Sequence, residues 1–548
     1  MRMWFIENKM RYFFIAIVSI AFASCSPKEQ VDLILHNGTF HSLNANNDTY
    51  EAVAIRDGKI VAVGPENEIL NGYKSSSIYD MEKKHIYPGF IDAHAHLLGY
   101  SLMKNDLDLV GTTSWNEIVE KLKGFQSKRS SGWIVGRGWD QNDWGTFSKD
   151  NVRPDGIPTN EALNTLFPRT PVVLVRIDGH AAIANNEAMR RAGMYVEGGV
   201  LLDNDMTKVL NAIPKHSKKE KAELLVEGQQ DCIAAGLTTI DEAGIDTDDL
   251  KIIDSLQKCG SFNLRVYAML NASDKDFQYW MERGPDTASS MLKVRGIKFM
   301  VDGALGSRGA CLKKAYSDVL TTKGALLNDP GYFRFRFAAA YARGFQVCTH
   351  AIGDSANAEV LKWYGELLEG VNDKRWRIEH AQVVDSADFA MFQQYSVIPS
   401  VQPTHAISDA PWALSRLGAA RLRYAYNYKR LLSFSNMVSL GTDFPVEVMD
   451  PLRTFYTAVF RKEYKEGSEV FAAEESLTPL QALYGMTVWA AVSNFEEAEK
   501  GSIEVGKFAD FTVLNMDILK ATDKEMLRAK VDQTILNGVV FRSGKRLS

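Results

Sequence analysis

Two histidines one residue apart, His94 and His96, follow an apolar stretch over residues 86–91. On a strand, side chains at positions i and i+2 point to the same side, so two imidazole nitrogens can face a single cation. Such a pair is half of a metal site. An isolated pair of this kind is more often two hydrogen-bonded histidines in a polar loop, so its meaning depends on residues further along the chain.

Downstream, residues of metal-binding types stand within or at the ends of other apolar stretches. They are Lys298, His350, His380 and Asp443. Each alone has a simpler explanation: a histidine can end a strand in a hydrogen bond, Asp443 can cap a turn, and Lys298 can pair with Asp302. Coincidences at several separate strands are improbable together, so the pattern favours one shared metal site. Imidazole and carboxylate ligands suit zinc and its neighbours and leave a position open for water.

The elements that would bring these residues together are eight apolar stretches, most of them separated by amphipathic, helix-like segments. The stretches are residues 86–91, 237–242, 264–270, 294–302, 345–350, 377–380, 396–402 and 437–443. Eight parallel strands alternating with helices describe an α/β fold, the TIM barrel, whose sites lie at the C-terminal ends of its strands. The sequence therefore predicts a barrel over residues 89–495 that gathers the candidate metal ligands at one end.

Both ends of the chain instead contain short stretches with the residue pattern of β-strands. An Asp-Gly pair joins two alternating apolar runs near residue 57, a strong hairpin signal, and similar runs occupy residues 506–514 and 531–541. We expect residues 25–88 and 496–548 to form one small β-sandwich, although two unrelated β appendages would show the same pattern. The interval 97–236 is too long for one barrel helix and predicts an inserted cap.

The N-terminus has the features of a targeting segment. Basic residues precede an apolar run over residues 12–23, which is signal-peptide length and short for a membrane span. Small residues before Cys25 resemble the lipobox of bacterial lipoproteins. We therefore predict a signal peptide over residues 1–24, lipidation of Cys25, and a lipid-anchored protein of the cell envelope, on the periplasmic or outer-membrane face. A plain secretory signal or an uncleaved anchor is the alternative.

Composition narrows the class of partner. The 548 residues are 45% hydrophobic and 24% charged, the formal net charge is −5, and no basic stripe is present. This balance gives no reason to expect nucleic acid. The expected partner is a small-molecule substrate, with membrane contact only through the N-terminal anchor, and a homodimer is left open.

The motifs together resemble a known family. Residues 88–96, 298–308 and 378–382, in the order His-x-His, Lys, His, His, Asp, resemble the amidohydrolase superfamily and its YtcJ-like branch, amidohydrolase family 3. The resemblance spans about residues 31–545. It implies a barrel inserted in a β-sandwich, a centre of one or two zinc-type ions, and hydrolysis of amide-like carbon–nitrogen bonds, formamides and cyclic amides among them.

The chemistry of such a centre gives the ligands their roles. An ammonium cannot bind a metal, but a buried neutral Lys298 amine can add carbon dioxide and become a carbamate that bridges two ions. If Lys298 is unmodified, Glu242 is the substitute ligand. Asp443 is the expected proton shuttle, from a metal-activated water to the leaving nitrogen. The predicted metal-site residues are His94, His96, Lys298, His350, His380 and Asp443.

Five further residues are predicted to contact substrate. Segments 132–144 and 172–180 are similar to family segments that face the pocket, and His405 is placed to bind a substrate carbonyl. Arg308, in a glycine-rich loop without phosphate-loop spacing, is a candidate contact for an anionic substrate. The set is Trp139, Asp178, His180, Arg308 and His405. The alternatives are a tryptophan in the cap core and a structural His405.

Two other functions keep the same barrel. One is a binding or regulatory lipoprotein without catalysis, which the complete set of ligand types disfavours. The other is a metal-dependent esterase or isomerase, which the sequence alone does not distinguish from an amidohydrolase.

Overall fold

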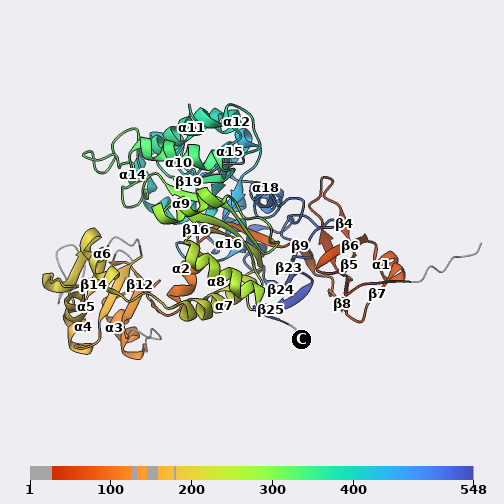
Figure 1. Cartoon of the computed structure of the whole chain (residues 1–548), viewed down its shortest axis with the longest axis horizontal. Helices are drawn as coiled ribbons and strands as arrows, with labels where there is room; N and C mark the ends of the chain where they lie inside the picture. Colours follow the sequence, from red (N-terminus) through yellow and green to blue (C-terminus); the bar gives the residue numbers. More distant parts are fainter. Residues whose placement is uncertain (1–27, 126–131, 142–143, 145–157, 178–180, 547–548) are drawn as a thin grey trace, which may run out of the picture.

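The computed structural model describes residues 28–125, 132–141, 144, 158–177 and 181–546, which form a barrel, a cap and a β-sandwich (Figure 1). Four predicted features lie outside the described residues: the expected signal peptide, the lipidation site Cys25, and the substrate contacts Asp178 and His180. Within these ranges, no helix is both long and apolar enough to cross a membrane.

Among the described residues, eight parallel strands pair in chain order and build the barrel. They are β10 (Phe90–Ala95), β16 (Leu237–Ile245), β17 (Arg265–Asn271), β18 (Leu292–Met300), β19 (Gln346–Ala351), β20 (Arg377–His380), β21 (Ile398–Val401) and β22 (Ser439–Leu440). The end of the last strand lies beside the first strand: just after β22, the N–H of Asp443 donates to the carbonyl of His94 in β10 at 2.8 Å. The predicted TIM barrel is confirmed.

The first predicted strand, 86–91, is in fact two strands. Residues His85–Pro88 form β9 of the sandwich, and β10 of the barrel begins after Gly89. The chain passes so close to the barrel here that a Cβ on Gly89 would lie 2.2 Å from Thr238 Oγ1. Glycine therefore allows one continuous apolar stretch to serve two sheets.

Helices cover the outside of the barrel and extend its C-terminal rim. They are α2 (Leu97–Met103), α7 (Lys218–Ala234), α8 (Thr247–Lys258), α9 (Asp274–Arg283), α10 (Pro330–Ala342), α11 (Asp354–Leu368), α12 (Phe389–Gln394), α13 (Pro403–Ser408), α14 (Ala410–Leu422), α15 (Tyr428–Ser435), α16 (Pro451–Phe460), α17 (Pro479–Gly485), α18 (Val488–Ser493) and α19 (Asp523–Met526). Helix α7 begins with a capping box formed by Ser217 and Glu220. Buried apolar side chains, such as those of Phe337 and Trp363, pack the helices against the strands.

The cap inserted after α2 has a sheet of its own. Its described strands are β11 (Leu107–Asp108), β12 (Ile134–Trp139), β13 (Val172–Arg176), β14 (Ala181–Ala184) and β15 (Val200–Leu202). Its helices are α3 (Trp115–Gly124), α4 (Glu161–Leu166), α5 (Asn186–Arg191) and α6 (Asp203–Ala212). The flanking helices α2 and α7 pack on each other and on β16, so they belong to the barrel.

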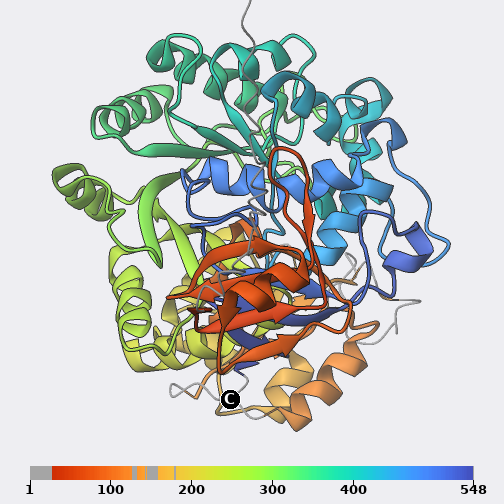
Figure 2. The ribbon, with the colours of Figure 1, turned by 90° about the vertical axis from the view of Figure 1, so that its right-hand side faces the viewer.

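Both chain ends contribute to the sandwich, which faces the viewer in Figure 2. One described sheet contains β6 (Lys59–Gly64), β5 (Ala52–Arg56), β2 (Leu33–His36) and β8 (Ile78–Asp80). The other contains β26 (Lys545–Arg546), β25 (Val539–Arg542), β24 (Val531–Leu536), β23 (Phe511–Leu514), β9, β3 (Thr39–His41) and β4 (Thr49–Tyr50). A small pair, β1 (Glu29–Gln30) and β7 (Tyr73–Lys74), and helix α1 (Glu66–Gly72) flank them.

Candidate metal centre

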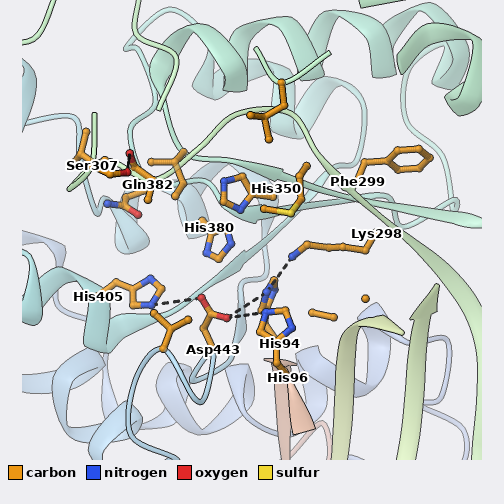
Figure 3. Close-up of a pocket in the computed structure, with 18 of the residues that line it drawn as sticks. His94, His96, Lys298, Phe299, Ser307, His350, His380, Gln382, His405 and Asp443 are labelled. Atoms are coloured by element: carbon orange, nitrogen blue, oxygen red, sulfur yellow. Dashed lines mark hydrogen bonds and ion pairs between the residues drawn. The ribbon is translucent and has the colours of Figure 1, made fainter. Parts of the chain in front are cut away.

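The C-terminal end of the barrel opens into a cavity of about 1290 Å³. All six predicted metal-site residues line it (Figure 3). His94 lies on β10 and His96 just after it, Lys298 lies on β18, and His350 on β19. His380 ends β20, and Asp443 follows β22. Five strands of the barrel thus place imidazole, amine and carboxylate groups around one space.

Asp443 stands at the centre of this group. Its Oδ1 lies 3.2 Å from His96 Nε2 and 3.6 Å from His94 Nε2, while its Oδ2 lies 3.6 Å from His405 Nε2. On the other side, Lys298 Nζ lies 3.0 Å from His94 Nε2. Two sets of atoms, one of His94, His96 and Asp443 and one of His380, His405 and Asp443, are close enough to share an ion.

Buried partners orient the histidines. Glu379 Oε2 lies 2.5 Å from His94 Nδ1, and Arg377 holds the same carboxylate through Nε at 2.8 Å. Gln402 Oε1 lies 2.7 Å from His380 Nδ1, so that nitrogen donates. A hydrogen bond at one ring nitrogen sets the tautomer and leaves the other lone pair for a metal. In both rings Nε2 is therefore the available atom.

The backbone of β20 explains how neighbouring residues serve one site. Successive side chains on a strand point to opposite faces, yet Glu379 and His380 both contact residues of the centre. His380 has a left-handed backbone with φ of 74°, and Asp443 has φ of 62°. Non-glycine residues in this region are strained by about 1–3 kcal/mol and cluster at functional sites.

Burial sets the charges of the site. It lowers the pKa of His94 to about 4 and of His350 to about 3, and in each ring the Lys298 charge adds to the effect. Burial would raise the pKa of Asp443, but His94 and the neighbouring imidazoles outweigh it and hold that pKa well below its usual range. At neutral pH the His94 and His350 imidazoles are therefore neutral beside an ionised Asp443 carboxylate.

Three buried atoms of the centre have no hydrogen-bond partner among the described residues: His350 Nε2, His405 Nε2 and Asp443 Oδ1. An unsatisfied buried polar atom costs about 1–3 kcal/mol. A divalent cation held by either of the two sets would satisfy the Asp443 carboxylate, and neutral imidazoles with a carboxylate are the donors that zinc-type ions prefer. The residues present therefore fit a divalent metal.

Three sequence-based assignments differ from the structure. Glu242 accepts from the N–H groups of Leu97 and Leu98, at 2.6 and 3.3 Å, and so caps α2 instead of reaching the centre. Trp139 does not line the cavity, because its indole is fully buried in the cap core and donates to Leu174 O at 2.9 Å. Tryptophan is a good core residue as well as a good contact residue.

Arg308 also lies off the cavity. Its Nε and Nη2 donate to Asp318 at 3.1 and 2.9 Å, whereas the preceding Gly306 and Ser307 line the space. His405 lines the cavity as predicted, and its Nε2 is buried with no hydrogen-bond partner among the described residues.

Several lining and orienting residues were missed from the sequence. The orienting residues are Glu379, Arg377 and Gln402, and the lining residues include Arg137, Asp140, Ile177, Gln382 and Trp412. Glu379 and Gln382 lie inside the motif at residues 378–382, so proximity to a ligand histidine was a usable signal. The cap residues Arg137, Asp140 and Ile177 lie inside segments 132–144 and 172–180, which are expected to face the pocket, but the predicted contacts are other residues of these segments.

The model of the amidohydrolase family matches residues 77–542 of the chain. LONG AFTER FAR-RED 3 of Arabidopsis thaliana is 30% identical, over 92% of this chain and 91% of that protein. YtcJ of Bacillus subtilis (strain 168) is 28% identical, over 92% of this chain and 98% of that protein. The N-substituted formamide deformylase of Arthrobacter pascens is 23% identical, over 93% of this chain and 98% of that protein.

A solved structure agrees with these relatives. An uncharacterized metal-dependent hydrolase from Pyrococcus horikoshii OT3 superimposes with a TM-score of 0.77 at 25% identity, over 90% of this chain and 99% of that chain. The resemblance to the amidohydrolase superfamily and its YtcJ-like branch is confirmed. This chain belongs to the amidohydrolase family and is a hydrolase with a site for a divalent metal ion.

Proposed function

We propose that the protein hydrolyses non-peptide carbon–nitrogen bonds of small amides, formamides or cyclic amides. The observation that carries the proposal is the Asp443 carboxylate, ionised, buried and lying between the imidazoles of His94, His96 and His405. A base in this position can move a proton between an attacking water and a leaving nitrogen. The full-length similarity to an N-substituted formamide deformylase supports the same bond type.

The ion we propose is zinc, held by His94, His96, His350 and His380. A bound divalent ion lowers the pKa of water to about 7 and polarises a substrate carbonyl. Lys298 is the proposed additional ligand, as a carbamate. Burial lowers the pKa of Lys298 below its ordinary value despite the nearby Glu379 and Asp443 carboxylates, which favours the neutral amine that reacts with carbon dioxide.

The chain's own groups carry the proton steps. Asp443 accepts a proton from the attacking water and then donates it to the nitrogen as the carbon–nitrogen bond breaks, so the products are a carboxylic acid and an amine. His405, whose Nε2 is buried without a hydrogen-bond partner among the described residues, would bind the carbonyl oxygen. General acid–base catalysis of this kind contributes about 10²–10⁴-fold.

The cavity indicates the form of the substrate. Apolar Met300, Phe333 and Trp412 share its wall with polar Gln382 and Arg416. Ligand sites of this kind combine an apolar surface with a few polar groups that fix orientation. We therefore expect an amide with an apolar or aromatic substituent.

The test uses metal-depleted protein reloaded with zinc, assayed against N-formyl, N-acyl and cyclic amides, with esters of matching shape as the comparison. We expect turnover of at least one amide class that depends on zinc and is lost in Asp443→Asn. Zinc-loaded protein that cleaves only esters, or no substrate of either kind, would contradict the proposal.

We also propose that Cys25 carries a lipid anchor that places the hydrolase at the cell envelope. The supporting observations are the basic residues, the apolar run and the small residues before Cys25. Cys25→Ser should move the protein from the membrane fraction to the soluble fraction. Membrane association that persists in this variant, without a change in mass, would refute the anchor.

A further inference from the structure

A second group of metal-binding side chains lies in the β-sandwich, outside the barrel site. His41, His85 and Asp517 each offer one ligand atom, and these atoms all lie within 4.8 Å of one another. His41 Nε2 and His85 Nδ1 are 3.1 Å apart, and His41 Nε2 is 4.0 Å from Asp517 Oδ1. None of the three takes part in the hydrolysis proposed above.

The strand pairing of the larger sandwich sheet brings these residues together. β3 runs parallel to β9 with Phe40 opposite Ile86, and both of these side chains are buried in the sandwich core. Alternation therefore turns His41 and His85 to the other face of the sheet. β23 pairs antiparallel to β9, with Leu514 opposite His85. Asp517 follows Leu514 by three residues and therefore lies near His85.

The distances are close to those of a tetrahedral ion. Zinc–nitrogen bonds of about 2.0–2.1 Å place two tetrahedral ligand atoms about 3.3 Å apart. The two ring nitrogens are already within about 0.2 Å of that separation at 3.1 Å. The Asp517 carboxylate oxygen, at 4.0 Å from His41 Nε2, is about 0.7 Å further away than that separation.

Neighbouring groups hold two of the three residues in place. The Tyr87 ring stacks on His41 at 4.5 Å between centroids and 4° between planes. The Tyr87 hydroxyl donates to Asp517 Oδ1 at 3.1 Å, as does the N–H of Leu519. Partners that orient ligands in this way accompany most metal sites and are worth about 10–100-fold in metal affinity.

The site is open to an incoming ion. His41 is buried, with 7% of its surface exposed, but His85 and Asp517 are partly exposed. The cation now beside Asp517 is Lys520, whose Nζ lies 3.1 Å from Oδ2. The Lys520 side chain is 85% exposed, so it can swing into solvent when an ion binds.

We propose that His41, His85 and Asp517 bind one divalent transition-metal ion of the zinc type. Two imidazoles and one carboxylate are donors for zinc, copper or nickel, whereas calcium and magnesium prefer oxygen alone. A water completes the fourth position. The ion joins the N-terminal segment, which supplies both histidines, to the C-terminal segment, which supplies Asp517, and so locks the two chain ends into one sandwich.

The first test counts zinc. The full chain, depleted of metal, is saturated with zinc, passed through gel filtration and measured by elemental analysis. We expect His85→Gln to retain one zinc per chain fewer than the parent, with hydrolytic activity unchanged. The matched control is His36→Gln, because His36 lies in the same sandwich and pairs with Glu66 at 3.2 Å, outside the cluster. Equal zinc content in His85→Gln and the parent would overturn the proposal.

A second measurement needs no variant. Crystals of the zinc-saturated parent, measured at the zinc absorption edge, should show an anomalous peak between His41 Nε2 and His85 Nδ1, in addition to any peak in the barrel. A peak in the barrel with none between these two rings would refute the sandwich site, whatever the behaviour of His85→Gln.

Discussion

Replacing Glu379 by Gln tests whether the barrel histidines are held for a metal. The carboxylate accepts from Arg377 at 2.8 Å and contacts His94 Nδ1 at 2.5 Å, and all three side chains are fully buried. Glutamine keeps the shape but loses the charge that orients His94. Loss of such an orienting group lowers metal affinity about 10–100-fold, or about 1.4–2.7 kcal/mol. We expect Glu379→Gln to bind zinc more weakly by this amount.

The control is Asp241→Asn, because Asp241 is the second buried carboxylate on Arg377, at 2.9 Å, and has no contact with His94 in the structure. Breaking a buried ion pair costs about 3–5 kcal/mol, so both variants should lose stability. Only Glu379→Gln should lose zinc affinity, measured by competition with a chelator. Equal zinc affinities for Glu379→Gln and the parent, or equal losses in both variants, would refute this reasoning.

Three further predictions concern the same end of the barrel. Asp443→Asn should lower kcat by about 10²–10⁴-fold while the circular dichroism stays unchanged and much of the zinc is retained; activity within a few-fold of the parent would exclude a proton-shuttle role. Gly441→Ala should lower the free energy of unfolding by about 1–3 kcal/mol, because the added Cβ would lie 2.5 Å from the backbone nitrogen of His94. The control Gly72→Ala has open space around the added Cβ and should leave the free energy of unfolding unchanged in the same denaturant titration. The contribution of His94 to the stability of the metal-free protein should be lost as pH drops from about 6.5 to about 4, because the unfolded chain protonates His94 at its ordinary pKa while burial and Lys298 lower that pKa to about 4 in the folded protein. The loss for this group is on the order of 3 kcal/mol, and a difference in unfolding free energy between the parent and His94→Gln that stays constant over this range would contradict it.

Much of the barrel could be predicted because its information is local. Parallel strands buried on both faces appear as continuous apolar runs, and along most of the barrel these runs alternate with amphipathic segments typical of helices. The order of the eight strands in the sheet is the same as their order in the sequence, as the alternating pattern predicts, because consecutive strands of a TIM barrel are neighbours. The sequence predicts the boundary between sandwich and barrel at residues 88 and 89 but a single strand over residues 86–91, whereas β9 and β10 separate at Gly89, where Thr238 approaches the backbone.

The fate of single polar side chains depended on neighbours far away in the sequence. Glu242 ends a barrel strand, as a ligand would, yet the N-terminus of α2 lies within its reach and takes the carboxylate. Arg308 sits in the loop above the centre, but Asp318 pairs with it. Trp139 packs into the cap core because the cap has its own sheet to cover.

The sequence by itself determined the family, the barrel and the six metal-type side chains that line its C-terminal end, because strand order and alternation follow from residue type and spacing. Whether those side chains bind the metal stays a prediction. Only the tertiary structure decided how these side chains are oriented. Glu379 contacts Nδ1 of His94, and Gln402 accepts from Nδ1 of His380. The left-handed backbone at His380 lets this ring and the neighbouring Glu379 side chain both reach the centre. The tertiary structure alone also brought His41 and His85 to Asp517, since that contact joins segments more than 400 residues apart and arises from pairing between the two chain ends.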